Sequence, residues 1–326
     1  MNAGTWNAGS IEVLVHEVVE ETPAIRTLRL VRPDRAPFPP YRAGAHIDVT
    51  GPTGVLRQYS LCGPPADLDS LLIAVKREPD SRGGSEALHT VRPGDRLEIG
   101  APRSLLSPAE DADRHLLVAG GIGITPLLSM AYELHARGAE FELHYVARTR
   151  EEAAFTGLLE YGVPFADRVR LHFGGGRGER PALLAREASR LTSSSYVCTC
   201  GPRGFMDQVT AAFAPVVGDA RVATEHFEAA GAEGGEGDSA FTVELDTGEV
   251  FAVRAGQSIL SALEAGGVEV FKSCEEGICG SCVSGVLEGT PEHRDNCLSA
   301  ADRASGTQIA LCVSRARTDR LVIELY

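Results

Sequence analysis

Cysteines gather near the C-terminal end of this 326-residue chain, where five of the eight fall within the last 53 positions. Three of them, Cys274, Cys279 and Cys282, are spaced C-x4-C-x2-C in a segment that also contains Gly277 and Gly280. This spacing is typical of 2Fe-2S clusters, because their iron favours soft, anionic thiolate ligands. The glycines let the loop wrap tightly and let backbone amides approach the sulfurs. The spacing therefore predicts an iron–sulfur site.

The fourth ligand is a choice between Cys297 and Cys312. Cys297 follows the polar run 293–296 and precedes an expected short helix, whereas Cys312 falls in the strand-like run 309–313. We choose Cys312 and interpret Cys297 as a free thiol. The alternative of a zinc site is less favoured, since zinc sites more often show two C-x2-C pairs.

Composition restricts the class of protein. Hydrophobic residues make up 43% and charged residues 23%, which is normal for a soluble globular protein and excludes a disordered or fibrous chain. The formal net charge of −14 argues against binding to nucleic acid or an anionic membrane. The N-terminal residues lack the basic and apolar regions of a signal peptide, and the most apolar stretch, 116–134, is interrupted by glycines and Pro126. We expect a cytoplasmic protein that is a monomer.

The hydrophobic pattern divides the chain into regions. Short apolar runs separated by proline and glycine predict an antiparallel β-barrel over residues 1–104. Strand-like and helix-like runs alternate over 105–227, which predicts a parallel sheet with helices on both faces. Residues 228–239 have the composition of a linker, and 240–326 begin with a hairpin. The expected helices of the last three segments are 127–136, 151–159, 182–188, 205–213 and 258–265.

The order of these regions resembles the phthalate dioxygenase reductase and vanillate demethylase reductase family, over roughly residues 10–326. The cysteine segment is similar to a plant-type ferredoxin, a β-grasp fold of the α+β class. The resemblance implies a flavin barrel, an NAD domain and a C-terminal 2Fe-2S ferredoxin domain. It also implies FMN as the flavin, since spacing alone does not separate FMN from FAD.

Two motifs in the first region point to the flavin. The run Arg57–Gln58–Tyr59–Ser60–Leu61 resembles the family's R-x-Y-S-L signature. An arginine can bind a phosphate with two parallel hydrogen bonds, a tyrosine can pack along the flavin, and Ser60 can donate near the flavin N5. The second motif, Arg82–Gly83–Gly84–Ser85, follows Ala74–Val75–Lys76 and precedes an expected helix start, which offers amides to an anion. Either motif alone is also compatible with an ordinary strand or capping turn.

The second region carries the predicted nicotinamide site. A strand, residues 116–119, leads into Gly120–Gly121–Ile122–Gly123–Ile124–Thr125–Pro126 and then a helix, and this run resembles the family's GGIGxTP motif. Glycines let the chain approach a pyrophosphate whose charge the helix N-terminus stabilises. Cys200–Gly201–Pro202 resembles the family's second motif, and the resemblance places Cys200 beside the nicotinamide. We interpret Cys198 as a small apolar strand residue.

Two features of the second region leave questions open. Basic residues at Arg148 and Arg150 could meet the 2′-phosphate of NADPH, but the family is mostly NADH-dependent, so we favour NADH. The family often reads H-x-E-x-F at the end of this region, with its aromatic residue near the flavin. Counted from His226, that position is Ala230, and Phe227 could take the role only if the register shifts.

Together these motifs predict a reductase that passes electrons from NADH through FMN and a 2Fe-2S cluster to a partner oxygenase, either Rieske-type or a haem monooxygenase. The net charge of −8 over residues 236–326 would suit a basic docking patch, with Glu275 and Glu276 best placed. Two alternatives stay open: a self-contained flavin, ferric or quinone reductase, and a non-enzymatic iron–sulfur sensor.

Overall fold

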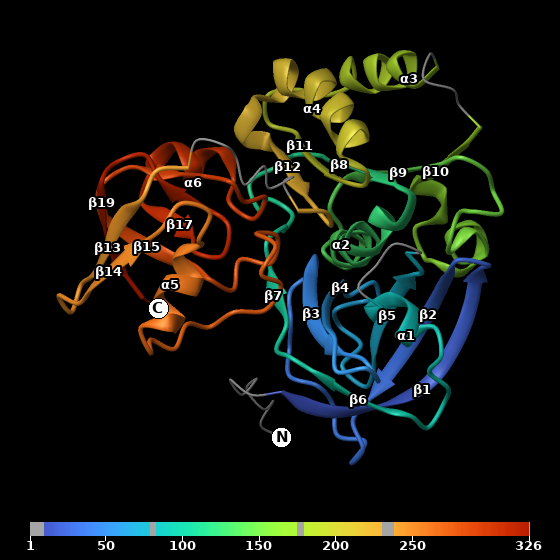
Figure 1. Cartoon of the computed structure of the whole chain (residues 1–326). Coiled ribbons are helices and arrows are strands. Elements are labelled where there is room, and N and C mark those ends of the chain that lie inside the picture. Colours follow the sequence, from blue (N-terminus) through green and yellow to red (C-terminus); the bar gives the residue numbers. More distant parts are fainter. Residues whose placement is uncertain (1–9, 79–82, 175–178, 230–237, 326) are drawn as a thin grey trace. The chain divides into compact units, whose positions relative to one another are not determined.

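The computed structural model describes residues 10–78, 83–174, 179–229 and 238–325 (Figure 1). It divides into two compact units, Met1–Glu225 and His226–Tyr326. The first unit contains both of the sheets expected over 1–104 and 105–227, so the division at residue 104 stays a prediction. Arg82, Ala230 and most of the expected linker lie outside the described residues.

The first sheet of unit 1 is antiparallel and closes on itself. Its strands follow the order β4-β3-β6-β1-β2-β5, with β7 paired to β3, and a bridge between Leu61 and Ile73 joins the two edges. Alternate side chains such as Val13, Val15 and Leu28 point inward and form the core. The predicted antiparallel barrel is therefore confirmed. Its elements are β1 (Ile11–Thr22), β2 (Ile25–Val31), β3 (Ala45–Thr50), β4 (Leu56–Ser60), β5 (Leu71–Lys76), α1 (Gly84–Leu88), β6 (Arg96–Ile99) and β7 (Arg103–Ser104).

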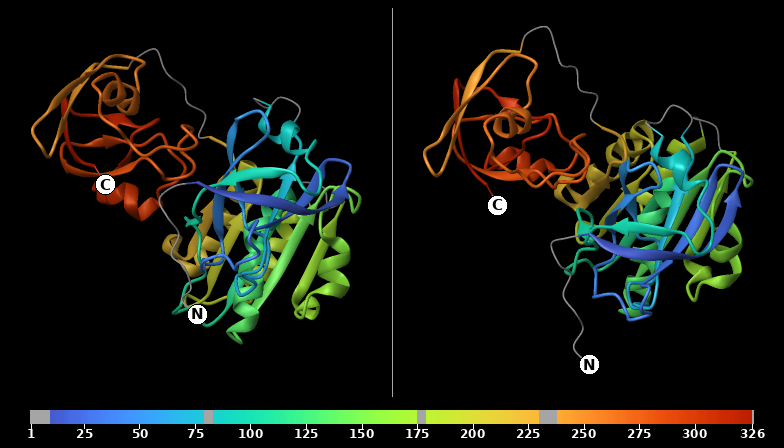
Figure 2. Two further views of the ribbon diagram at one scale, coloured as in Figure 1. Left: turned by 90° about the horizontal axis from the view of Figure 1, so that it is seen from below. Right: turned by 60° about the horizontal axis from the view of Figure 1, so that its bottom comes forward.

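The second sheet of unit 1 is parallel, in the order β10-β9-β8-β11-β12, and Figure 2 shows its strands side by side in green to yellow. Its elements are β8 (His115–Gly120), α2 (Ile124–Ala136), β9 (Phe141–Ala147), β10 (Val169–Phe173), α3 (Glu179–Ala188), β11 (Tyr196–Cys200), α4 (Arg203–Val217) and β12 (Val222–Glu225). Leu117 and Leu143 pack with α2 on one face, whereas Leu116 and Val118 pack with α3 and α4 on the other. Helices on both faces confirm the expected α/β architecture.

The helix expected over residues 151–159 forms only at its end. Residues 151–155 lie in turns and loop, residues 156–157 are helical, and a π-helical turn follows over Leu158–Gly162. Phe155 has a φ of 63° and its backbone N–H donates to Glu21 Oε2 at 3.0 Å. A left-handed residue tied to the barrel interrupts the right-handed helix, so the 3.6-residue pattern was overridden by a tertiary contact.

Unit 2 is a mixed sheet that packs against a helix. The sheet order is β14-β13-β19-β15-β17, in which β13 and β19 are parallel and the other pairs antiparallel. Leu260 and Leu263 of α5 pack against Val243 and Ile323 of the sheet, which is the β-grasp arrangement expected. Its elements are β13 (Phe241–Leu245), β14 (Val250–Val253), α5 (Ile259–Ala265), β15 (Val283–Glu288), β16 (Pro291–Glu292), α6 (Ala300–Ser305), β17 (Gln308–Ala310), β18 (Arg315–Ala316) and β19 (Arg320–Glu324).

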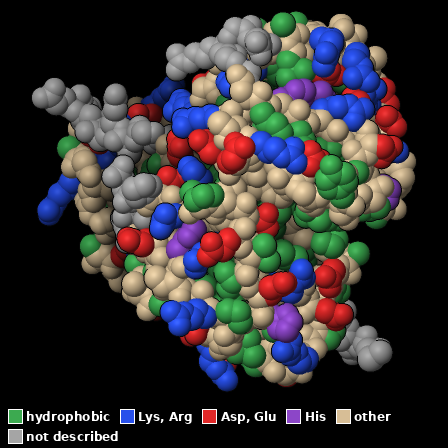
Figure 3. Space-filling model, turned by 90° about the vertical axis from the view of Figure 1, so that its right-hand side faces the viewer, with side chains coloured by type: hydrophobic (Ala, Val, Ile, Leu, Met, Phe, Trp, Pro, Cys, Tyr) green, Lys and Arg blue, Asp and Glu red, His purple; other side chains and the backbone are tan. Residues whose placement is uncertain are grey.

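The surface carries mixed charge on the face shown in Figure 3, where basic and acidic side chains are interspersed. Unit 1 carries ion pairs such as Arg150 with Glu160 and Arg29 with Glu17. Within the described ranges, no helix combines the length and the apolar composition that crossing a bilayer would need.

Candidate functional site

The two predicted nucleotide motifs meet at the carboxyl edge of the parallel sheet. β8 and β11 are neighbours, so the turn after Gly120 lies against the turn after Cys200. A Cβ on Gly123 would overlap the carbonyl oxygen of Cys200, and one on Gly201 would lie 3.0 Å from Gly120 Cα. Gly121 has a φ of +55°, which favours glycine. The glycines are therefore required by contact between the two backbones. The carboxyl edge of the sheet, where they lie, is the position at which doubly wound folds bind dinucleotides.

The helix that follows the glycine turn is built to begin there. Thr125 Oγ1 donates to the carbonyl oxygen of Ile122 at 3.0 Å, and Pro126 lies buried in the first turn, where its missing N–H costs nothing. α2 then runs for 13 residues. On the neighbouring strand β11, Pro202 is the N-cap of α4, and its carbonyl oxygen accepts from the backbone N–H of Phe205 at 2.8 Å. Both helix starts direct amides toward the same edge, which suits a pyrophosphate.

Ser60 and Cys200, the two predicted catalytic residues, lie on strands that meet through a buried pair. In the barrel, Ser60 is the cross-strand partner of His46. In the parallel sheet, Cys200 is the neighbour of Glu225 on β12. His46 Nδ1 lies 3.9 Å from Glu225 Oε1, and all four side chains are buried. The barrel and the nucleotide sheet thus converge on these four residues.

Burial keeps this junction uncharged. It raises the pKa of Glu225 to about 8 and lowers the pKa of His46 to about 4, where Arg103 adds to the effect. The pKa of Cys200 is also raised well above its usual value by burial, and then by Glu225. At pH 7 the acid is mainly protonated, the imidazole neutral and the thiol intact. Among the described residues, His46 Nε2 and Glu225 Oε2 have no hydrogen-bond partner, which leaves polar atoms for a ligand.

The sequence analysis missed Glu225, and the strand explains why. β12 ends at Glu225, which is buried, whereas Glu228 is exposed. If the family's H-x-E-x-F pattern is aligned to start at Ala223 instead of His226, its acidic position falls on Glu225 and its aromatic position on Phe227. Its first position is then alanine rather than histidine. Counting from His226 placed the acid on an exposed residue instead. The burial of the strand end is the signal that separates the two registers.

The two predicted flavin motifs lie together. A Cβ on Gly84 would lie 2.8 Å from Arg57 Cγ, so the arginine side chain passes directly over the first turn of α1. Gly83 has a φ of +89° and leads into this turn, and Ser85 Oγ accepts from the backbone N–H of Glu78 at 3.1 Å. A guanidinium beside a glycine turn that opens a helix suits the phosphate of a flavin mononucleotide. Arg82 lies outside the described residues.

The remaining predicted flavin residues divide into two groups. Tyr59 is half-buried against the barrel core, and Ala74 and Val75 are buried in β5. Gln58 Nε2 instead donates to Asp48 Oδ1 at 2.8 Å, and Lys76 Nζ pairs with Glu78 at 2.6 Å. The Gln58 contact joins β4 to β3, whereas the Lys76 contact is a local pair at the surface, and their role toward a cofactor stays a prediction.

The cysteines of unit 2 form two pairs. Cys274 shares a side-chain hydrogen bond with Cys279, and Cys282 shares one with Cys312. The hydrogen bond with Cys274 lowers the pKa of Cys279 to about 5, and the hydrogen bond with Cys312 lowers the pKa of Cys282, so in each pair one thiol loses its proton more readily than its partner. Three cysteine sulfurs never fall within 4.8 Å of one another in the described part of the chain. A mononuclear zinc site would bring four sulfurs that close, so two pairs fit a two-iron cluster better.

Cys297 has a different environment, as expected for a free thiol. It contacts Asp295 Oδ2 at 3.5 Å, and burial and Asp295 raise its pKa. Asp295 is itself buried and accepts from Ser314 Oγ and the backbone N–H of Leu298. The backbone N–H of residue 296 donates to Gly277 in the cluster loop at 2.7 Å. These hydrogen bonds connect the segment around Asp295 to the cluster loop at Gly277. Cys312 itself follows β17 in a turn rather than lying in a strand.

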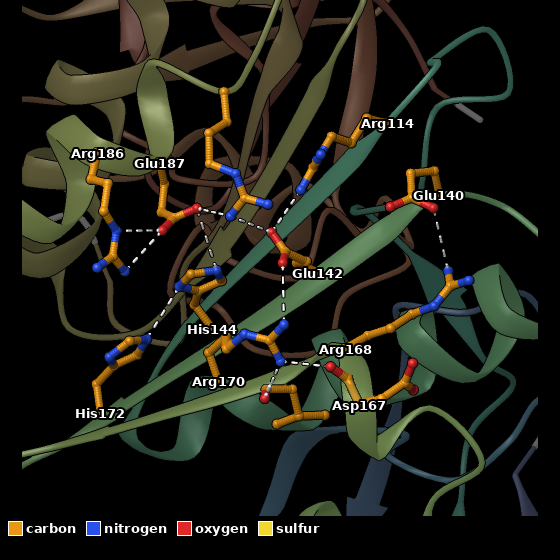
Figure 4. Close-up of polar contacts among 12 residues, drawn as sticks. Arg114, Glu140, Glu142, His144, Asp167, Arg168, Arg170, His172, Arg186 and Glu187 are labelled. Carbon is orange, nitrogen blue, oxygen red and sulfur yellow. Dashed lines mark hydrogen bonds and ion pairs between the residues drawn. The ribbon is translucent and has the colours of Figure 1, made fainter.

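A second group of ionisable residues lies on the α3 face of the parallel sheet (Figure 4). One ligand atom each of Glu142, His144 and Glu187 lie within 4.8 Å, the closeness that a metal site needs. However, Arg190 Nη1 lies 2.8 Å from Glu187 Oε2 and 3.1 Å from Glu142 Oε2, so a guanidinium already occupies the space between the carboxylates. His144 Nδ1 contacts His172 Nε2 at 3.2 Å. We therefore assign this cluster the structural role of fixing the end of α3 to β9.

These features together define an iron–sulfur oxidoreductase: a barrel with a candidate phosphate site, a sheet edge suited to a dinucleotide, and two pairs of cysteines. A family profile for the 2Fe-2S iron–sulfur cluster binding domain matches residues 243–317. Vanillate O-demethylase oxidoreductase of a Pseudomonas species is 42% identical over 322 residues, which cover 97% of this chain and 100% of that protein. This chain belongs to the vanillate O-demethylase oxidoreductase and phthalate dioxygenase reductase family.

Solved structures agree with this assignment. Phthalate dioxygenase reductase, described as a modular structure for electron transfer from pyridine nucleotides to 2Fe-2S, superposes with a TM-score of 0.70 at 34% identity, covering 97% of this chain and 98% of that one. An intact type IV self-sufficient cytochrome P450 monooxygenase superposes with a TM-score of 0.86 at 34% identity. That match covers 96% of this chain and 41% of the monooxygenase chain.

Proposed function

We propose that this protein is the reductase component of a multicomponent oxygenase and transfers electrons from NADH, through FMN and a 2Fe-2S cluster, to a partner oxygenase. The observation that carries the proposal is that one chain combines the dinucleotide edge at Gly120–Gly123 with the two cysteine pairs of unit 2. When bound, a flavin accepts the two electrons of a hydride and releases them singly, as a 2Fe-2S cluster requires.

The chain's own residues have separate tasks in this proposal. The glycine turn and the first turn of α2 bind the pyrophosphate, and Arg57 with Gly83 and Gly84 binds the FMN phosphate. Ser60 and Cys200 line the junction at which nicotinamide and flavin meet. Because Glu225, His46 and Cys200 are neutral and buried, they would keep water away from a hydride transferred there. Cys274, Cys279, Cys282 and Cys312 hold the cluster.

The partner is proposed from the relatives. They are named for vanillate O-demethylation, phthalate dioxygenation and a cytochrome P450 monooxygenase. The acceptor proposed for this chain is accordingly a Rieske-type oxygenase or a haem monooxygenase. We further propose that the reductase is cytoplasmic and monomeric. Size-exclusion chromatography would test the second point, because a monomer has a mass of 34.6 kDa.

The proposed docking charges lie on the cluster loop. Glu275 has a φ of 56° and is exposed, with Glu276 beside it. Lys272 Nζ pairs with Glu275 at 3.1 Å and with Glu264 at 2.8 Å, so part of the acidic charge is neutralised within the loop. Charge reversal at both residues 275 and 276 should therefore slow reduction of a basic protein acceptor several-fold and leave dye reduction unchanged.

The decisive experiment uses two acceptors with the reconstituted protein. Ferricyanide can take electrons from a flavin directly, whereas cytochrome c, a basic haem protein, serves as the one-electron protein acceptor. Cys274→Ser should lose nearly all NADH-dependent reduction of cytochrome c and keep reduction of ferricyanide. Cys297→Ser is the matched control and should keep both activities.

The alternatives give different results in the same assay. A self-contained flavin or quinone reductase would reduce cytochrome c almost as well after Cys274→Ser. A non-enzymatic iron–sulfur protein would reduce neither acceptor in the wild type. Either outcome would end the proposal of an electron relay.

A further inference from the structure

Arg150 lies where a dinucleotide-binding sheet distinguishes its two coenzymes. β9 is the neighbour of β8, whose turn carries Gly120–Gly123, and Arg150 follows the carboxyl end of β9 by three residues. In doubly wound folds the adenosine ribose lies over the end of a strand near the glycine turn. There a free arginine accommodates the 2′-phosphate of NADPH, whereas an acidic residue favours the 2′-hydroxyl of NADH.

The guanidinium of Arg150 is already paired. Arg150 Nη1 donates to Glu160 Oε1 at 2.7 Å, and Nη2 donates to Glu160 Oε2, so the contact is bidentate. The hydrogen bond to Glu160 raises the pKa of the arginine, and the same bond lowers the pKa of the carboxyl. The arginine side chain is 49% exposed and that of Glu160 is 25% exposed, so the pair lies at the surface where a coenzyme could reach it.

Contacts with the end of β10 hold the Arg150–Glu160 pair in place. Phe173, the last residue of β10, is the register partner of Ala147, and its ring lies 5.8 Å from the Arg150 guanidinium. The backbone N–H of Gly174 donates to the carbonyl oxygen of Arg148 at 2.9 Å, which keeps the two loops together beyond the strands. Glu160 reaches Arg150 from the π-helical turn Leu158–Gly162, which is present because the expected helix is interrupted.

We propose that Glu160 is a specificity-determining residue that pairs with Arg150, withholds it from the 2′-phosphate and thereby selects NADH over NADPH. The inference rests on the proposed function. NADPH would have to compete with a bidentate carboxylate for the arginine and would place its phosphate beside that carboxylate. NADH, which carries a 2′-hydroxyl, meets neither cost.

The test measures kcat/KM for NADPH and NADH with ferricyanide as acceptor. Glu160→Gln should raise the NADPH to NADH ratio by up to about five-fold, the most by which an exposed ion pair of this kind shifts an equilibrium. The gain should appear mainly in the KM for NADPH. Glu160→Ser, which shortens the side chain, has the same expectation and serves if the first variant does not fold.

Two further variants separate release of the arginine from a general change of charge. In Arg150→Gln/Glu160→Gln the ratio should return to within about two-fold of the wild type, because the released group is absent. Glu152→Gln removes an exposed acid from the same segment and should leave the ratio unchanged. An unchanged ratio in both Glu160 variants, an equal gain in Glu152→Gln, or a gain that survives in the double variant would overturn the proposal.

Failure of this inference is distinct from failure of the proposed function. If the wild type does not oxidise NADH with ferricyanide, the proposed function is wrong. If the wild type oxidises NADH but the NADPH to NADH ratio of kcat/KM is the same in the Glu160 variants, only the proposed role of Glu160 is wrong.

Discussion

Glu225→Gln should flatten the pH dependence of the stability of unit 1. Burial raises the folded pKa of Glu225 to about 8, whereas its ordinary value is 4.5. The folded state therefore holds a proton that the unfolded state releases, and this contribution to stability is full below pH 4.5 and is lost as the pH rises toward 8. Burial and Arg103 lower the pKa of His46 to about 4, so the histidine contributes the opposite slope only between about pH 4 and 6.5.

Between pH 6.5 and 8 only Glu225 of this pair changes the balance. Over that window the folded protein keeps a proton on Glu225 that the unfolded chain has already released, so the free energy of unfolding falls by about 1.5 kcal/mol. For a unit of this size that is about 3–6 °C in thermal midpoint. Glutamine keeps the shape without the charge, so between pH 6.5 and 8 the midpoint of the variant should fall by about 3–6 °C less than that of the wild type.

The assay is calorimetry of wild type and variant in matched buffers at pH 6.5, 7.25 and 8. The difference between the two proteins isolates Glu225, because all other groups titrate in both. His46→Gln is the matched control and should keep the slope above pH 6.5. An identical decline in wild type and Glu225→Gln would refute the reasoning that this carboxyl is protonated in the fold.

Three further predictions concern the sites themselves. Gly123→Ala should abolish NADH oxidation and lower the free energy of unfolding by about 1–3 kcal/mol through overpacking, whereas Gly204→Ala, with open space around it, should do neither, as denaturant titration would show. Cys312→Ser should lose the visible absorption of the cluster while Cys297→Ser retains it. Gly277→Ala should lower the iron content, since its Cβ would lie 2.6 Å from Val313 Cγ2; normal iron incorporation would contradict this.

The parts of the site that local chemistry dictates could be predicted from the sequence. The C-x4-C-x2-C spacing and the run Gly120–Gly123 each form a motif within one loop, although the contact that requires Gly123 is with Cys200 on another strand. The pair His46–Glu225 could not be predicted, because 179 positions separate two residues that meet only when the barrel packs on the sheet. The same is true of the helix expected over 151–159, whose pattern was overridden by a barrel carboxylate.

The two halves of the proposed relay differ in charge for physical reasons. At the junction in unit 1, burial neutralises Glu225 and His46 and keeps the Cys200 thiol protonated, so these three side chains add no charge of their own to the place proposed for hydride transfer. On the cluster loop of unit 2, Glu275 is exposed, and the hydrogen bond with Cys274 lowers the pKa of the Cys279 thiol. A single electron must leave toward another protein there, and surface charge steers that encounter without entering the junction where the hydride moves.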